Sequence, residues 1–476
     1  MRTYTASTPV PASAAALFDW HERPGAFERL TPPWQRVSLA RHDGIRDGDR
    51  AVIRLGAGPL SLDWIAEHEG YDDACRRGER ACRFEDRQVS GPFAAWHHTH
   101  RMLPVGPSAS VLVDEVDYTL PLAPVSEAVG GWAAESQFDR MFGYRHRVTR
   151  EDLGRHTEAD AAPMTVAITG ATGLVGSALA AFLTGGGHTV VRLVRSPEAV
   201  VTWDRGPQER AVYWNVERGE IEIDALQRLA PDALVHLAGE PVYALAYTAD
   251  KKRRIWESRT KGTQLLARAL AALDTPPRVL VSASASGFYG DRGDAPITEA
   301  DAPGGGFLAD VCQAWEASTA EAEAAGIRTV HARIGLVVTP AGGMLQKLAP
   351  AAHIGLGGWP GEGSMYWPWI TLDDAIYALA FLLRNEAVFG PVNVSAPEPV
   401  QARTFVETLG DVLSRPAVLR APRSVVRALG GEVADELALK SVRMRPARLG
   451  DAGFRFAYPD LPAALGHVLG RFDASS

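Results

Sequence analysis

Apolar stretches with a strand-like pattern dominate the first part of the chain. A strand at Tyr4–Val10 leads into a helix at Ala12–Trp20, for which Pro11 and Ser13 are suitable starting residues. A long amphipathic helix at Val129–Arg150 closes this part. Between the two helices the pattern predicts strands at Trp34–Ala40, Asp49–Leu55, Ser61–Glu69, Ala81–Val89, Ala94–Leu103 and Ser110–Leu120.

Strands and helices alternate after Gly154–Pro163, a polar stretch rich in Ala and Pro that is typical of a linker. The first unit has a strand at Val166–Thr169, a helix at Leu174–Leu183 and a second strand at Thr189–Val194. Such alternation predicts a parallel sheet that helices cover on both faces. Further strands are expected at Ala233–Gly239, Arg278–Ser282 and Thr329–Gly335, helices at Lys251–Leu273 and Cys312–Ala325, and a small helical tail at Ser414–Leu469.

Three glycines connect the first strand of the alternating part to its helix. Gly170, Gly173 and Gly176 have the spacing G-x-x-G-x-x-G. The first permits a sharp turn, the second lets the backbone approach a pyrophosphate, and the third lets helix pack closely on strand. The phosphates would lie at the helix N-terminus, where the N–H groups and the dipole favour negative charge. A Gly-rich turn without a ligand is the alternative; the position between strand and helix favours a dinucleotide.

The end of the second strand indicates which dinucleotide. An NAD site usually has a carboxylate there for the ribose 2′-hydroxyl, whereas this strand ends in Arg195 and Ser196. A guanidinium and a hydroxyl suit a 2′-phosphate, so we predict NADP(H), although Arg195 as a solvated strand-end residue is the alternative. The predicted cofactor-binding residues are Gly170, Thr172, Gly173, Leu174, Val175, Gly176, Arg195, Ser196, Leu237, Ala238 and Gly239.

Composition excludes several classes of protein. A net charge of −8 without a basic block argues against nucleic acid as a partner. The N-terminus lacks a signal sequence, and no apolar run approaches the roughly 18 residues of a membrane span. The three cysteines, Cys75, Cys82 and Cys312, form no disulfide framework or metal motif and fit a reducing cytosol, with Cys75 and Cys82 as packing residues. A cytoplasmic protein is expected.

A run of small hydroxylated residues follows the strand at Val279–Ser282. Because ligands of open α/β sheets bind beyond the carboxyl ends of the strands, Ser284 and Ser286 could reach the nicotinamide end and bind a substrate oxygen. Tyr289 could act as proton donor if its pKa were lowered from about 10. A polar turn in which Tyr289 packs on a neighbour is the alternative. The predicted catalytic residues are Ser284, Tyr289 and Ser286.

Two resemblances to known families refine this picture. The element order of the first part, with phrases at residues 15–20 and 27–30, resembles START-like helix-grip domains of the polyketide cyclase type (SRPBCC), which implies a cavity for an apolar ligand. Residues 164–470 are similar to the extended short-chain dehydrogenase/reductases, in the epimerase family branch with its C-terminal domain of unknown function. The stretches that carry this second likeness are 170–176, 236–241, 282–291, 306–316, 369–374, 390–397 and 453–461.

The departures from the second family affect its chemistry. The resemblance implies a Tyr-x-x-x-Lys pair on the helix after the Ser-containing strand, where Lys lowers the Tyr pKa. With Glu316 as register marker, Leu308 and Cys312 occupy these positions, and neither can move that proton. Ser284 matches the family serine best. After Pro241, this chain has residues 242–247, Val-Tyr-Ala-Leu-Ala-Tyr, where the branch has a Gly-Lys-Arg-Trp-like stretch.

The fold class is therefore predicted as an α/β Rossmann-type doubly wound parallel sheet, with an N-terminal α+β helix-grip domain and a small C-terminal helical region. The expected boundaries are 1–155 for the ligand-binding domain, 156–163 for the linker, 164–413 for the NADP-binding domain with lid segments, and 414–470 for the C-terminal domain. At 476 residues the chain is too long for one core.

Three functions remain open. The first is an NADP(H)-dependent oxidoreductase or isomerase acting on a small apolar or aromatic carbonyl substrate, with Tyr289 or a serine-held water as proton donor. The second is an NADP(H)-binding sensor without turnover, which the missing Tyr-Lys pair favours. The third, a nucleotide-sugar epimerase of the usual kind, is weakest because it needs NAD and that pair. The sequence leaves the substrate, the reaction direction and the oligomeric state open.

Two further clusters of side chains have alternative interpretations. His97, His98 and His100 invite a metal site, but strand alternation sends His97 to the opposite face, and no carboxylate or Cys stands at a matching spacing, so no metal is expected. Aromatic residues in and after the Gly-rich segment Gly355–Gly363 could line a substrate lid or pack in a core; they are Trp359, Tyr366, Trp367 and Trp369.

Overall fold

The structure is a computed structural model that describes residues 1–472 except 57, 59–60, 122–124 and 159–161. The chain forms two compact units, of which the first contains Met1–Ala162 and the second Pro163–Leu183 and His188–Arg471. None of the described helices is both long and apolar enough to cross a membrane.

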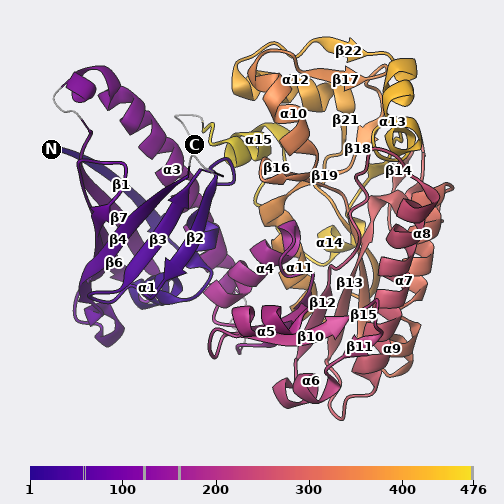
Figure 1. Ribbon diagram of the computed structural model, residues 1–476, viewed down its shortest axis with the longest axis horizontal. Helices are drawn as coiled ribbons and strands as arrows, with labels where there is room; N and C mark the ends of the chain where they lie inside the picture. The colour runs from indigo at the N-terminus through magenta and orange to yellow at the C-terminus, as the bar shows by residue number, and fades with distance from the viewer. Residues whose placement is uncertain (57, 59–60, 122–124, 159–161, 473–476) are drawn as a thin grey trace. The chain divides into compact units, whose positions relative to one another are not determined.

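The first unit is built on a seven-stranded antiparallel sheet with the order β1-β7-β6-β5-β4-β3-β2 (Figure 1). The seven strands lie within a few residues of the predicted positions. Their bounds are β1 Arg2–Val10, β2 Val37–His42, β3 Arg50–Leu55, β4 Leu62–Asp72, β5 Cys82–Ser90, β6 Ala95–Gly106 and β7 Ala109–Thr119. A sheet-rich N-terminal part is thus what the structure shows.

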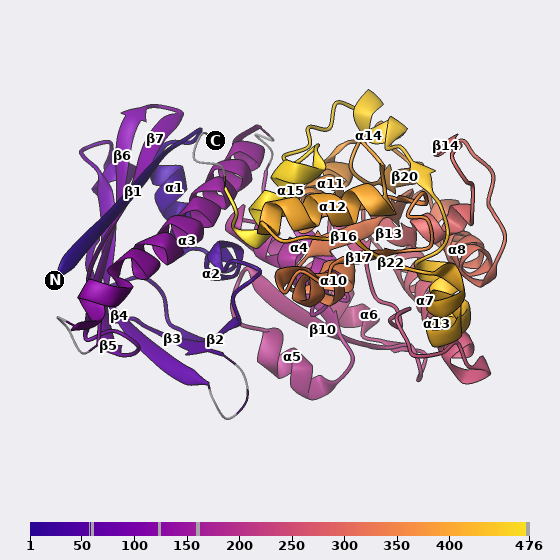
Figure 2. The same cartoon turned by 90° about the horizontal axis from the view of Figure 1, so that it is seen from above.

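Helices cover one face of this sheet. They are α1 (Ala14–Glu22), α2 (Ala26–Leu30) and α3 (Val125–Glu158), and Figure 2 shows α3 running across the sheet. Ser13 caps α1 as expected, since its hydroxyl accepts a hydrogen bond from the N–H of Ala16. The α1 side chains Leu17, Phe18 and Trp20 are fully buried in the core under the sheet.

Helix α3 continues past its predicted end at Arg150 to Glu158, and so takes up the start of the expected linker. A buried ion pair holds this extension, because Arg29 of α2 donates to both carboxylate oxygens of Asp152 at 2.8 and 2.9 Å. The polar composition of this stretch is typical of a linker. Asp152 is nevertheless part of a helix because it has a buried partner in α2, which the local sequence does not reveal.

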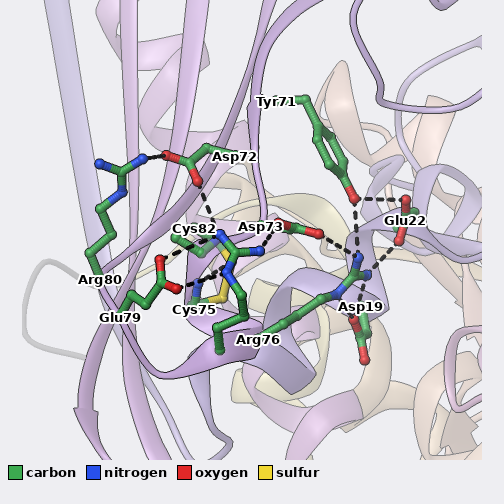
Figure 3. Close-up of polar contacts among 12 residues, drawn as sticks. Asp19, Glu22, Tyr71, Asp72, Asp73, Cys75, Arg76, Glu79, Arg80 and Cys82 are labelled. Atoms are coloured by element: carbon green, nitrogen blue, oxygen red, sulfur yellow. Dashed lines mark hydrogen bonds and ion pairs between the residues drawn. A yellow bond between two sulfur atoms is a disulfide. The ribbon is translucent and has the colours of Figure 1, made fainter.

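Cys75 and Cys82 are buried in the core of the first unit, as the packing interpretation predicts, but they also form a disulfide, which the sequence analysis did not expect (Figure 3). A short 3-10 turn, η2 (Ala74–Arg77), joins β4 to β5 and brings the two Cα atoms within 5.0 Å. Ion pairs flank the turn, among them Arg76 with Asp19 and Glu22. Cys312 is the free, buried cysteine.

The second unit has an eight-stranded sheet with the order β11-β10-β9-β8-β12-β13-β15-β20. Neighbouring strands are parallel except β10 and β11, which confirms the predicted Rossmann-like fold. The strands are β8 Thr165–Thr169, β9 Thr189–Val194, β10 Glu209–Asn215, β11 Glu220–Ile221, β12 Ala233–His236, β13 Val279–Ala285, β15 Arg328–Ile334 and β20 Gly390–Val394.

Helices pack on both faces of this sheet (Figure 1). Val166 and Ile168 of β8 point into a core with α4 (Leu174–Gly185) and α11 (Leu372–Arg384), whereas Ala167 between them points into a core with α7 (Ala249–Ala271). Smaller helices are α5 Pro197–Trp203, α6 Ile223–Leu229, α8 Phe307–Ala317 and α9 Ala320–Ala324. The single helix predicted at Cys312–Ala325 is therefore two, broken where the Thr319 hydroxyl donates to the Glu316 carbonyl.

Segments after β15 form a third core. Trp359, Trp367 and Trp369 are buried in it, so the core interpretation holds for these three residues, whereas Tyr366 is only partly buried and lies outside this core. The remaining elements of the second unit are β14 Pro296–Ile297, which precedes β15 and pairs with β23, and, after β15, β16 Leu336–Thr339, α10 Gly343–His353, β17 Gly358–Pro360, β18 Tyr366–Trp367, β19 Trp369–Thr371, β21 Val400–Gln401, α12 Ala402–Leu413, β22 Leu419–Ala421, α13 Arg423–Leu437, β23 Arg443–Met444, α14 Ala447–Asp451 and α15 Leu461–Leu469.

Candidate functional site

The three glycines form the sharp turn between β8 and α4 that their spacing predicts. Gly170 has a φ of +69°, and a Cβ added there would lie 2.9 Å from the backbone nitrogen of Ala238 at the end of β12. A Cβ at Gly176 would lie 2.2 Å from the Gly170 carbonyl oxygen, and one at Gly173 would lie 3.2 Å from it. No side chain fits at Gly176, so the helix can approach the turn only with glycine there.

Helix α4 begins directly at this turn. Ser177 donates its N–H to the Gly173 carbonyl at 2.9 Å, so the N–H groups of Leu174, Val175 and Gly176 precede this first helical bond. Thr172 and Gly173 are exposed, which leaves the turn open to a ligand. A helix N-terminus of this kind attracts phosphate groups through its N–H groups and its dipole.

A buried hydrogen-bond relay, which no sequence motif predicted, fixes the end of β12 against the turn. The Thr169 hydroxyl accepts from the N–H groups of Leu237 and Ala238 at 3.2 Å each, and donates to Nδ1 of His236 at 2.7 Å. His236 Nε2 then donates to Thr263 at 2.9 Å. Burial lowers the pKa of His236 to about 3, so the ring stays neutral in this relay. The backbone of Leu237 and Ala238 is held beside Gly170.

The end of β9 contains three polar residues with different surroundings. Arg195 is exposed, whereas the Ser196 hydroxyl accepts from the N–H of Ala199 and caps α5. Arg192, which the sequence analysis did not single out, is buried; it donates to the Ala171 carbonyl of the glycine turn at 2.9 Å and stacks on Trp203. Two guanidinium groups therefore lie near this end of the strand, and that of Arg192 also pairs with Glu209 of β10 at 3.3 Å.

Two of the three predicted catalytic residues belong to a buried network. The Ser284 hydroxyl donates to Glu316 at 2.7 Å, and Glu316 pairs with Arg333 at 2.8 Å. Arg333 also donates to the Tyr289 hydroxyl, which in turn donates to Asn393 of β20 at 2.7 Å. The Tyr289 side chain is 0% exposed, and burial raises its pKa. A hydroxyl so placed holds the turn after β13 to β20 and cannot reach a substrate unless the site rearranges.

Ser286 lies differently from Ser284 and Tyr289. It is half-buried at the start of η3 (Ser286–Tyr289), next to Gly287, where an added Cβ would lie 3.3 Å from the Leu308 Cβ and 3.9 Å from the Cys312 sulfur. The helix positions of Leu308 and Cys312 thus face the serine-rich strand end. Burial raises the pKa of the Cys312 thiol to about 11, so it stays protonated and apolar at this site.

Tyr247 is a candidate that sequence reasoning missed. Its hydroxyl is buried and has no hydrogen-bond partner within the described part of the chain, while its ring packs on Phe307 at 5.6 Å. Burial raises its pKa, and the charge of Arg259 acts in the opposite direction. Arg259 donates to the Glu240 carbonyl at 2.9 Å, next to Gly239. The departure at residues 242–247 was the available signal, because it places two tyrosines in this loop.

The histidines of β6 lie in the first unit, as alternation predicted, with His98 and His100 inside and His97 on the other face. The reason given against a metal site is nevertheless wrong. Asp86 of β5 and Asp114 of β7 stand beside His98 and His100 on the same face, because β5 and β7 flank β6. Carboxylates on neighbouring strands do not show up as a spacing along the chain.

Comparisons with known proteins identify the family. A model of the NAD dependent epimerase/dehydratase family matches residues 166–395, and one of a domain of unknown function (DUF1731) matches residues 421–468. An epimerase family protein of Mycobacterium bovis is 39% identical over 306 residues, which are 64% of this chain and 98% of that protein. The chain belongs to the NAD dependent epimerase/dehydratase family. The predicted resemblance to the epimerase branch and its C-terminal domain is confirmed.

Two solved structures of epimerase relatives add to this. The nucleoside-diphosphate sugar epimerase of Corynebacterium glutamicum is 32% identical with a TM-score of 0.77, and the match covers 98% of this chain and 90% of that one. The human epimerase family protein SDR39U1, solved with NADPH, is 27% identical with a TM-score of 0.57, over 65% of this chain and all of that one. Family membership supports a nucleotide-binding, epimerase- or reductase-like role.

Proposed function

We propose that this epimerase family protein binds NADP(H) at the glycine turn and acts as an oxidoreductase or isomerase on a small carbonyl compound. The observation that carries the proposal is the cradle at Gly170–Gly176, where an added Cβ at Gly176 would lie 2.2 Å from the Gly170 carbonyl oxygen. A backbone so bare of side chains, beside a helix N-terminus, suits a pyrophosphate. The relative solved with NADPH supports the same cofactor class.

The preference for NADP(H) over NAD(H) rests on the end of β9. Arg195 is exposed there, and it forms no ion pair in the part of the chain that the structure describes. A guanidinium in this position can make charge-assisted hydrogen bonds to a 2′-phosphate. The Ser196 hydroxyl caps α5, so Ser196 would lie next to the 2′-phosphate while its hydroxyl stays bonded to the helix. When bound, the cofactor supplies or accepts the hydride at its nicotinamide.

The chain's own residues would then handle substrate and proton. Ser286, half-buried at the strand end, is proposed to bind the substrate oxygen. Tyr247, with its unbonded hydroxyl, is proposed to hold and move the proton in place of Tyr289. Burial and the charge of Glu436 raise the pKa of Tyr247, and the charge of Arg259 offsets this only in part, so the hydroxyl is protonated and is proposed to act as the proton donor. Ser284 and Tyr289 are assigned a positioning role through Glu316 and Arg333.

Titration with NADPH and NADH tests the cofactor proposal. Arg195→Ala is expected to weaken NADPH binding by about 10–100-fold and to leave NADH binding unchanged, since about 1.5–3 kcal/mol is typical of a hydrogen bond to a charged group. Arg278→Ala, at the amino end of β13 and thus at the opposite edge of the parallel sheet, is the matched control. Equal loss for both cofactors, or tighter NADH binding by the wild type, contradicts the proposal.

A second candidate function is cofactor sensing without turnover. The apolar pair Leu308 and Cys312, packed against Gly287, favours it because neither side chain can move a proton. Mixing the full chain with NADPH and a panel of ketones, aldehydes and enones while following cofactor absorbance separates the two. Oxidation of NADPH that Tyr247→Phe abolishes supports the enzyme; tight binding without oxidation across the panel supports the sensor.

For the first unit we propose a START-like ligand-binding domain. Its support is the element order, in which a sheet of seven strands carries one long helix across its face. Binding of a fluorescent apolar probe to the full chain tests it. Probe binding that an aromatic substitution such as Trp96→Ala leaves unchanged would contradict a ligand site among the aromatic residues under the sheet.

A further inference from the structure

A compact group of histidine and aspartate side chains lies on the inner face of the first sheet. Asp86 of β5 pairs with His98 of β6, and His100 of β6 pairs with Asp114 of β7. Because alternate residues of a strand share a face, the four side chains point to the same side. His98 and Asp114 are 3% and 2% exposed. Charged and polar groups buried to this degree are expected to be paired or to bind metals.

Three of these side chains have the spacing of metal ligands. Asp86 Oδ2 lies 3.2 Å from His98 Nδ1 and 3.8 Å from His100 Nε2. One ligand atom from each of the three residues can be chosen so that all lie within 4.8 Å of one another. With metal–ligand bonds of about 2.0–2.2 Å, the ligands of a tetrahedral ion lie about 3.3–3.6 Å apart. The observed separations need only a small adjustment to reach that geometry.

Asp114 contacts the imidazoles of both His98 and His100 on the side away from Asp86. Its Oδ1 atom lies 3.1 Å from His98 Nε2 and 2.6 Å from His100 Nδ1, which are the ring nitrogens that face away from Asp86. His146 of α3 approaches the other oxygen of Asp114 at 2.6 Å. Histidines that bind metal usually donate their second N–H to a carboxylate, which orients the ring and raises the basicity of the ligating nitrogen.

A separate observation also points to a ligand at this cluster. His68 of β4 pairs in register with Asp86 and is 7% exposed, yet neither of its ring nitrogens has a hydrogen-bond partner among the described residues. A buried imidazole usually forms at least one hydrogen bond. His68 thus offers an unused nitrogen beside the three proposed ligands.

We propose that Asp86, His98 and His100 bind a divalent transition-metal ion inside the first unit, with Asp114 and His146 orienting the two imidazoles. Two imidazoles and one carboxylate suit ions of the Zn²⁺ and Fe²⁺ class, whereas Mg²⁺ and Ca²⁺ prefer ligand sets made of oxygen alone. Three protein ligands leave a coordination position open for His68, water or a small ligand. The site is independent of the cofactor cradle in the second unit.

The test uses the full chain, stripped of metal and titrated with Zn²⁺ against a chromophoric chelator. One tight Zn²⁺ site per chain is expected, with Mg²⁺ unable to compete. His98→Gln and His100→Gln should each weaken Zn²⁺ binding by more than about 100-fold, and Asp114→Asn by about 10–100-fold. His97→Gln is the discriminating comparison, since His97, Glu69 and Glu85 form a second group of possible ligands on the opposite, less buried face; Zn²⁺ binding at the tight site should not change.

X-ray absorption spectroscopy of the wild-type Zn²⁺ complex identifies the types of metal ligand without any substitution. The result therefore does not depend on whether a variant folds. At least two imidazole ligands with oxygen ligands beside them are expected. Three results would overturn the proposal: no tight Zn²⁺ site in the wild type, equal weakening by His97→Gln and His98→Gln, or a shell of oxygen atoms alone. The first result would mean that the cluster is a hydrogen-bonded network without a metal.

Discussion

The two units build their candidate sites by different means. In the second unit the site is a backbone cradle made by one turn, Gly170–Gly176, at the carboxyl edge of a parallel sheet. In the first unit it is a group of side chains on three neighbouring antiparallel strands, with His98 and His100 between Asp86 and Asp114. The residues of the glycine cradle follow one another along the chain, whereas the histidines and aspartates of the first unit come together only through the register between strands. A sequence motif can therefore reveal the glycine cradle, which one turn forms, but not the cluster on three strands.

The largest effect is expected from filling the glycine cradle. A Cβ at Gly176 would overlap the Gly170 carbonyl oxygen, so Gly176→Ala must move the turn and should abolish measurable NADPH binding. Zn²⁺ binding by the first unit should be unaffected if the sites are independent. The control is Gly450→Ala, where nothing lies within 4 Å of the added Cβ. Calorimetric titration measures the affinities for NADPH and for Zn²⁺. Unchanged NADPH binding by Gly176→Ala would show that the cofactor does not bind at the glycine cradle.

Each unit also has a buried ion pair whose removal should destabilise that unit. Arg333→Met leaves Glu316 and Tyr289 without their buried partner, and Arg29→Met does the same to Asp152. The loss of unfolding free energy should be about 3–5 kcal/mol in each case. Arg403→Met, in an exposed pair with Glu407, should cost at most about 1 kcal/mol. Denaturant unfolding checks this, and a loss near the control's value would contradict the assigned role of either pair.

Two tyrosines separate structure from chemistry within the second unit. Tyr289→Phe removes one hydrogen-bond partner each from Arg333 and Asn393 and should cost about 1–3 kcal/mol of stability. Tyr247→Phe removes a buried hydroxyl that has no partner among the described residues, so stability should stay the same or rise. Tyr247→Phe should lose turnover while it keeps its affinity for NADPH. Tyr289→Phe should not lose turnover. The reverse pattern would restore Tyr289 as the proton donor.

The disulfide of the first unit should have a modest effect on stability. The loop between Cys75 and Cys82 is short, so Cys75→Ala should lower the unfolding free energy by about 2 kcal/mol. Thiol labelling of the denatured, unreduced chain should find one reactive cysteine, Cys312, and three after reduction. Three labelled thiols before reduction would show that the pair is reduced in the isolated protein, as the expectation of a cytoplasmic location requires.

Local pattern was enough to predict most of the fold. The strands of the first sheet and five of the eight strands of the second followed from apolar stretches, whereas β10, β11 and β20 were not predicted. The turn at Gly170 followed from glycine spacing and its place between strand and helix. What could not be predicted depends on distant partners. Asp152 extends α3 only because Arg29 is buried beside it, and Cys75 meets Cys82 only because η2 folds back.

The candidate site was predictable to the same degree. The cradle residues were found, but the fate of Tyr289 depends on Arg333 and Asn393, which are 44 and 104 residues away along the chain. Ser284 is likewise taken up by Glu316 on α8. Tyr247 gave one signal, as a departure from the family's usual stretch, and its unbonded hydroxyl appears only in the structure.

The most direct test of the cofactor account is a crystal structure of the full chain soaked with NADPH. We predict that the pyrophosphate lies against the backbone of Gly170–Gly176 and that the 2′-phosphate contacts the Arg195 guanidinium. Density for the cofactor at another place, or an empty turn at NADPH concentrations that saturate binding in solution, would contradict it.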